Sequence, residues 1–143
     1  MLKCFTYLIF FLTLLSFNLQ AQKHGKLYSK IEADVLYGPV ITSNVITAAQ
    51  LSVLCEGRDI LMFRMMGNQY AILGAHREYL LSTELVTYSE TDIFTVFSTS
   101  VILELLKTGG ADNTYIEKRE SVLSITNGST TLEFGTFCPP FCE

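Results

Sequence analysis

The chain has 143 residues, which is enough for one ordinary domain and too few for two. It carries 10 basic and 14 acidic residues, for a formal net charge of −4. A mildly acidic chain with scattered lysines has no electrostatic grip on a phosphate backbone or an anionic membrane surface, so we expect no nucleic-acid partner.

The first 21 residues have the pattern of a secretory signal peptide. Lys3 precedes an apolar run over residues 5–17, and Ala21 is a small residue at a polar boundary. The apolar run is shorter than the roughly 20 residues that a membrane-spanning helix needs. We therefore expect cleavage near Ala21, a periplasmic or secreted protein, and no stable membrane span afterwards. An uncleaved anchor is the alternative.

Residues 22–137 are expected to form one α+β domain. Its first strand is predicted over 29–36 and ends at Gly38-Pro39, a dipeptide that usually marks a turn. The residues from Thr47 to Gln50 fit a capping box, in which the threonine hydroxyl and the glutamine side chain satisfy each other's backbone amides. A short helix is therefore predicted over 48–56, with its apolar stripe against a sheet.

The stretch 59–74 predicts a β-hairpin, because strand-forming residues flank Gly67-Asn68, a pair that two-residue turns favour. This register places Met66 opposite Gln69 and makes both hairpin faces apolar. Such strands are covered on both sides, or they present a surface to a partner. The tail residues Phe137 and Phe141 are candidates for that cover. The predicted partner surface is the face that carries Ile60, Met62, Arg64, Met66 and Leu73.

The second half repeats the order strand, helix, hairpin. A strand over 93–97 and a helix over 101–107 are favoured, with one helix over 91–107 as the alternative. A hairpin over 122–134 is predicted to turn at Asn127-Gly128, with one face buried and one face in water. Asn127 is also formally a glycosylation acceptor, although the turn explains the same residues. The sequence thus predicts a mostly antiparallel sheet with two short helices on one face. Two β-α-β-β units in tandem would fit the repeated order.

The chain ends in a tail over 138–143, where Cys138 and Cys142 flank two prolines and a phenylalanine. A bridge between these two cysteines requires the chain to turn, because disulfides need Cα atoms within about 7 Å. A bridge from Cys55 to either one would instead fasten the tail to the first helix, and free thiols are the third alternative. Two thiolates and one dependable histidine are too few ligands for a metal site, so we predict none.

Motifs of catalysis and cofactor binding do not occur: there is no nucleophile elbow, phosphate loop, dinucleotide-binding motif or His-x-x-x-His. His76 with Cys55, or with a nearby carboxylate, would make a small hydrolase-like enzyme. Cys55 on an apolar helix stripe is more typical of a buried hydrophobe. The sequence therefore predicts a non-catalytic, exported binding or interaction module without cofactors. Its partner would be a protein or a component of the cell envelope, and a homo-oligomer is compatible with the sequence.

Overall fold

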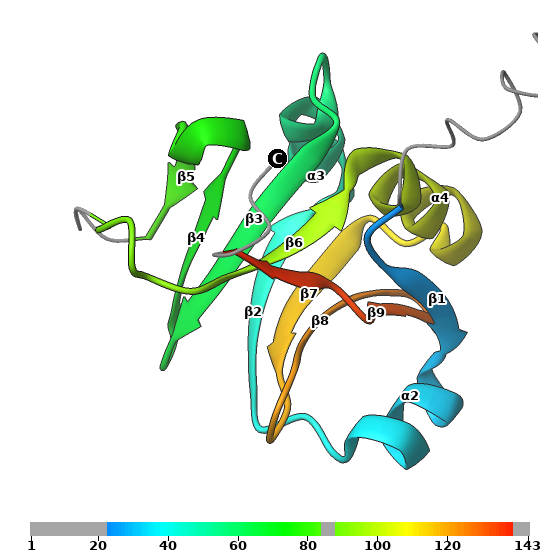
Figure 1. Cartoon of the computed structure of the whole chain (residues 1–143). Helices are drawn as coiled ribbons and strands as arrows, with labels where there is room; N and C mark the ends of the chain where they lie inside the picture. Colours follow the sequence, from blue (N-terminus) through cyan, green and yellow to red (C-terminus); the bar gives the residue numbers. More distant parts are fainter. Residues whose placement is uncertain (1–22, 84–87, 139–143) are drawn as a thin grey trace, which may run out of the picture.

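The computed structural model describes residues 23–83 and 88–138 (Figure 1). These residues form ten strands and three short α-helices, and every strand pairing is antiparallel, which confirms the predicted α+β class. The helices are α2 (Lys30–Tyr37), α3 (Ala48–Cys55) and α4 (Thr99–Gly109). The strands are β1 (Lys26–Ser29), β2 (Thr42–Thr47), β3 (Ile60–Met66), β4 (Gln69–Leu73), β5 (Tyr79–Ser82), β6 (Phe94–Ser98), β7 (Asn113–Lys118), β8 (Leu123–Asn127), β9 (Thr130–Glu133) and β10 (Thr136–Cys138), and a 3-10 turn, η2 (Ala75–Arg77), precedes β5.

The strands divide into two five-stranded sheets. The first sheet has the order β1-β9-β8-β7-β2, and the second has the order β10-β6-β3-β4-β5. The order strand, helix, two strands occurs twice, as β2-α3-β3-β4 and as β6-α4-β7-β8. The leading strand of each unit pairs in the sheet of the other unit, because β2 pairs with β7 and β6 pairs with β3. Whether the two units arose by duplication stays a prediction.

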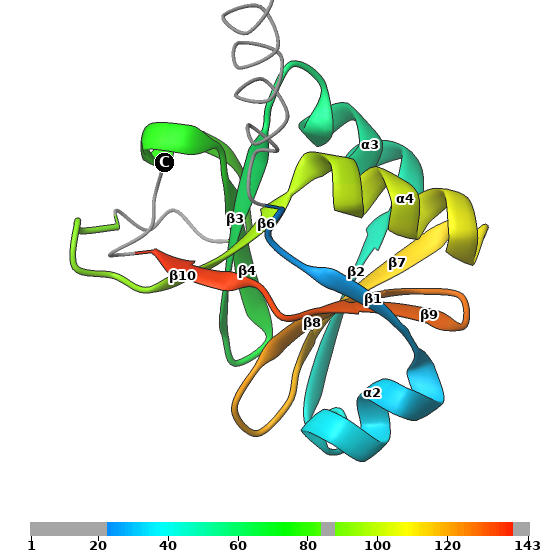
Figure 2. The same ribbon diagram turned by 45° about the vertical axis from the view of Figure 1, so that its right-hand side comes forward.

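The main core lies between the two sheets. The first sheet contributes Ile116, Ile125 and Leu132, and the second contributes Phe63 and Phe97. Helices α3 and α4 lie side by side at one end of this space and add their apolar side chains to the same core (Figures 1 and 2). We call the sheet faces that meet in this core the inner faces. A second, smaller apolar cluster lies on the outer face of the second sheet.

The predicted strand over 29–36 is wrong, because most of that segment is the helix α2. Ser29 begins the helix with a capping box: its hydroxyl accepts from the Glu32 amide at 3.3 Å, and the Glu32 carboxylate accepts from the Ser29 amide at 2.9 Å. Lys30 and Asp34 form an i, i+4 ion pair along the same helix. These local hydrogen bonds outweigh the strand preference of the β-branched residues.

Both helices that the sequence predicts are present. The capping box of Thr47 and Gln50 begins α3 as expected, with the Gln50 amide donating to the threonine hydroxyl at 3.1 Å. A strand followed by a helix is confirmed over 93–107, and the single helix over 91–107 is wrong. The whole of β6 is buried in the second sheet, so its sheet pairing decides the conformation. The third helix, α2, lies apart from the other two (Figure 2).

The first hairpin has the predicted register, with Met66 opposite Gln69. The second hairpin turns one residue later than predicted, at Gly128-Ser129, because Asn127 pairs with Thr130 at the end of β8. The Asn127 side chain is fully buried and bonds both backbone groups of Ala111, at 2.9 and 2.8 Å. This side chain is therefore structural in the folded chain and is closed to glycosylation.

The face of the second hairpin that was expected in water is also buried. Ser124, Thr126, Thr131 and Glu133 are at most 3% exposed. The side chain of Arg119 and the helix α2 lie against this face, as Tyr37 of α2 contacts Tyr28 of β1 in an edge-to-face arrangement. The prediction of one wet face was wrong because a polar face can be buried when its groups bond one another.

Several predictions fall on residues that the structure does not describe. The signal peptide, residues 1–21, lies outside the described residues, as does the tail from residue 139 onward. Cys138, predicted as the first tail residue, is instead the last residue of β10 and pairs with Phe94. In the part of the chain that is described, no helix is long and apolar enough to cross a membrane.

Candidate functional site

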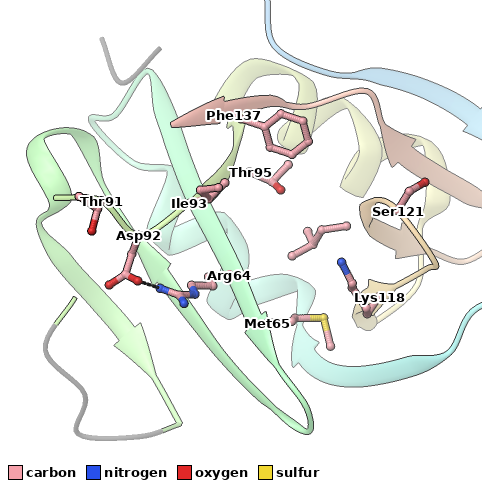
Figure 3. Close-up of a pocket in the computed structure, with 10 residues that line it drawn as sticks. Arg64, Met65, Thr91, Asp92, Ile93, Thr95, Lys118, Ser121 and Phe137 are labelled. Carbon is pink, nitrogen blue, oxygen red and sulfur yellow. Dashed lines mark ion pairs between the residues drawn. The ribbon is translucent and has the colours of Figure 1, made fainter. Parts of the chain in front are cut away.

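A cleft of about 420 Å³ lies at the open end of the space between the two sheets (Figure 3). Helices α3 and α4 close the other end, far from the tip of β3 and the turn between β7 and β8 (Figure 1). The volume is within the range of about 300–1,000 Å³ that is typical of small-molecule sites. The lining residues are Arg64, Met65, Thr91, Asp92, Ile93, Thr95, Lys118, Ser121, Leu123 and Phe137.

The second sheet supplies one wall of the cleft. Side chains two residues apart on a strand share a face, so Met65 continues the inner face that Phe63 begins. Thr95 is opposite Phe63 on β6, and Phe137 is opposite Thr95 on β10. Phe137 remains 51% exposed because it stands where the core has ended. This wall therefore changes from packed core to open apolar surface within one pair of residues.

The first sheet supplies the facing wall. Lys118 and Leu123 are opposite each other, where β7 and β8 meet at their turn. Leu123 is 7% exposed and belongs to the main core, whereas Lys118 is exposed. The lysine amine points into the space that the labelled residues of the second sheet enclose (Figure 3). The cleft thus has an apolar floor and a cationic group at its rim.

An ion pair spans one side of the cleft. The Arg64 guanidinium lies 2.6 Å from the Asp92 carboxylate and stacks over the rings of Tyr88 and Phe94. The hydrogen bond from Arg64, with a second from the Ser89 amide, holds the pKa of Asp92 below its ordinary value. Asp92 therefore stays ionised at neutral pH, and the charge of Arg64 is already matched by its partner.

The other lining cation, Lys118, belongs to none of the ion pairs that the described residues form. Two cations and one carboxylate give the cleft one unmatched positive charge, although the whole chain is acidic. The lining contains neither cysteine nor histidine. The arrangement can hold a ligand by ion pairing, hydrogen bonding and apolar contact.

The predicted partner surface on the first hairpin is wrong for three of its five residues. Ile60, Met62 and Leu73 are at most 7% exposed and belong to the outer cluster of the second sheet, together with Cys138 and Phe94. Arg64 and Met66 are partly exposed, and Arg64 covers apolar rings with its stem. The predicted cover by Phe137 is also wrong, since that ring lines the cleft, and Phe141 lies outside the described residues.

Arg77 organises the cover that the sequence did not reveal. Its guanidinium donates to the backbone carbonyls of Ser89, Glu90 and Asp92 at 2.7–2.9 Å and lies over the Phe94 ring. The segment after η2 is thereby held across the outer face of the second sheet. Hydrogen bonds between an arginine and carbonyls far along the chain leave no local pattern in the sequence.

The structure does not favour the Cys55 and His76 pair. Cys55 is a free thiol that is 4% exposed, and burial raises its pKa to about 11. Such a thiol is protonated at neutral pH and is a weak nucleophile. His76 is exposed on η2, and neither residue lines the cleft. Among residues 23–83 and 88–138, no hydrogen bond joins the two side chains, and no three potential metal ligands gather.

The bridge from Cys55 to the tail is wrong, because Cys55 is free and lies in the main core. Cys138 is fully buried at the end of β10, with its sulfur 3.8 Å from the Arg77 guanidinium. Cys142 lies outside the described residues. A Cys138–Cys142 bridge therefore stays a prediction.

Sequence reasoning also missed a buried ionic cluster around Arg119, which is fully buried. Its guanidinium lies 3.0 Å from Glu133, 2.8 Å from Asp34 of α2 and 3.7 Å from Glu117, and it donates to Ser124 at 2.9 Å. The cluster ties α2 to the first sheet. The only signal in the sequence was the alternation of hydroxyl and acidic residues on β8 and β9, which is equally typical of a solvated face.

In comparisons with known proteins, no family model, no curated protein and no solved structure matches this chain.

Proposed function

We propose that this protein is exported and works as a non-catalytic binding module of the cell envelope or the extracellular space. The observation that carries the proposal is the cleft between the sheets, with an unmatched positive charge and exposed apolar side chains at its rim. Large apolar groups exposed beside convergent polar groups are typical of binding sites. Ile93 and Phe137 are 61% and 51% exposed there.

Export is part of the same proposal and is supported by the signal-peptide pattern of residues 1–21. In an oxidising compartment a Cys138–Cys142 bridge would persist and would fasten the tail close to β10. The partner is a protein or another component of the envelope, because the acidic chain has no phosphate-binding surface.

The proposal is tested by photo-crosslinking in the producing cells. p-Benzoylphenylalanine replaces Phe137 at the cleft or, as the matched control, Val53, which is 60% exposed on α3. We expect an adduct from position 137 alone, in the exported fraction, on a chain whose N-terminus is Gln22. Equal labelling from both positions would contradict the cleft as the binding site, and an uncleaved chain inside the cell would contradict export.

A further inference from the structure

The charges of the cleft restrict the kind of ligand that it can hold. Arg64 is neutralised by Asp92 at 2.6 Å, which leaves the Lys118 amine as the unmatched charge among the lining residues. One free cation matches one anionic group, whereas a phosphate diester chain or a dianion would call for several. The Ser121 hydroxyl lies on the turn beside Lys118 and can donate a second hydrogen bond to the same anion.

The apolar lining restricts the rest of the ligand. Met65 and Leu123 belong to the edge of the main core, so an apolar chain that enters the cleft would extend that core. Phe137 and Ile93 lie nearer the rim and lose the most exposed surface when the cleft is filled. Each buried methylene contributes about 0.8 kcal/mol, so a chain of several carbons is needed for useful affinity.

Given a binding role for the cleft, which is the proposed function on which this inference rests, we propose that its ligand is an amphipathic monocarboxylate. The carboxylate binds the Lys118 amine, and the apolar chain lies between the two sheets along Met65, Leu123 and Phe137. The space of about 420 Å³ accommodates a single chain of this kind.

The probe is octanoate, compared with 1-octanol, which has the same chain without the charge, and with butyrate, which has the charge without the chain. Titrations of the ¹⁵N-labelled mature protein are followed by amide shifts. We expect saturable octanoate shifts at the cleft residues, about tenfold weaker binding of 1-octanol, and no saturation with butyrate.

Two pairs of variants separate charge from apolar contact. Lys118→Met should weaken octanoate about tenfold and leave 1-octanol unchanged, whereas Lys107→Met, at an exposed lysine of α4, should change neither. Phe137→Ala should weaken octanoate and 1-octanol by the same several-fold factor. Phe134→Ala, at a ring that is 71% exposed outside the cleft, is its control. All four positions are exposed, so the variants should fold.

Three outcomes would overturn the inference: octanoate shifts that map elsewhere, equal binding of octanoate and 1-octanol, or an unchanged octanoate affinity in Lys118→Met. These failures are distinct from failure of the proposed function. If octanoate does not bind but position 137 still forms a specific adduct in cells, the cleft is a binding site for another ligand class. If octanoate binds but no adduct forms, the ligand assignment stands and the macromolecular partner is excluded.

Discussion

Arg119 is the residue with the most unusual environment in the described chain. Its fully buried guanidinium faces three carboxylates, of which Glu133 is also fully buried. Burial raises the pKa of Glu133 above its ordinary 4.5, while the Ser124 hydroxyl and the charge of Arg119 act in the opposite direction. A raised pKa in the folded state means that stability falls as pH rises above 4.5, because ionised Glu133 is disfavoured in the core. Arg119 limits that loss.

Arg119→Met should therefore lower the free energy of unfolding by about 3–5 kcal/mol, as removing one partner of a buried pair does. The deficit should be larger at about pH 7.5 than at about pH 5, because Glu133 can take up a proton at the lower pH. Urea unfolding at both pH values measures it. Adding Glu133→Gln should recover part of the loss. Lys30→Met, in a surface ion pair, should cost at most about 0.5 kcal/mol. A deficit in Arg119→Met no larger than that control would refute this role.

At the scale of elements, short-range hydrogen bonds decide where helices begin. α2 and α3 each follow directly on a strand, and each starts with a capping box, from Ser29 and Thr47. The end of α4 depends on a distant contact instead. A Cβ on Gly109 would overlap the carbonyl and side-chain oxygens of Asn127, and a Cβ on Gly128 would lie 2.6 Å from the Gly109 carbonyl oxygen. The helix end and the second hairpin therefore meet backbone to backbone.

Gly109→Ala should destabilise the protein by about 1–3 kcal/mol, because the added methyl group forces these two elements apart. Gly110→Asn is the matched control. Gly110 has a left-handed φ of +64° as the C-cap of α4 and has open space around it, and asparagine tolerates that conformation. We expect the control to stay within about 0.5 kcal/mol of the parent chain in urea unfolding. Equal midpoints for the two variants would show that the close contact is unimportant.

At the scale of the whole molecule, each face of the second sheet has its own cover. The inner face packs against the first sheet, and the outer face lies beneath the segment that Arg77 holds. The inner space is closed by α3 and α4 at one end only, which leaves the cleft at the other. The position of the cleft follows from this arrangement, since no single strand contains enough of its lining to mark it.

Met62→Lys tests the cover of the outer face. Met62 is fully buried, so a lysine there would leave an unpaired charge in the core and should cost about 3–5 kcal/mol. Met66→Lys, at the partly exposed tip of the same strand, should be tolerated within about 0.5 kcal/mol. Circular dichroism melts and size-exclusion chromatography measure fold and oligomeric state. A stable, monomeric Met62→Lys protein would show that the outer face is open and would restore it as a partner surface.

The sequence by itself determined the features that depend on neighbours in the chain. The capping box at Thr47, the Gly67-Asn68 turn with its register, and the strand and helix on either side of Ser98 were predicted correctly. It also contained the capping box at Ser29, which the strand-like residues around it obscured. Hydrogen bonds over three or four residues and period-two alternation can be read locally.

Only the tertiary structure decided which faces are buried and where the site lies. The polar face of the second hairpin is buried because Arg119 and α2 satisfy its side chains, and the outer face of the first hairpin is buried because Arg77 fastens a distant segment over it. The cleft joins Met65 and Phe137 of one sheet to Lys118 of the other. These contacts link residues tens of positions apart, and an apolar or polar side chain does not record in its own sequence which partner will cover it.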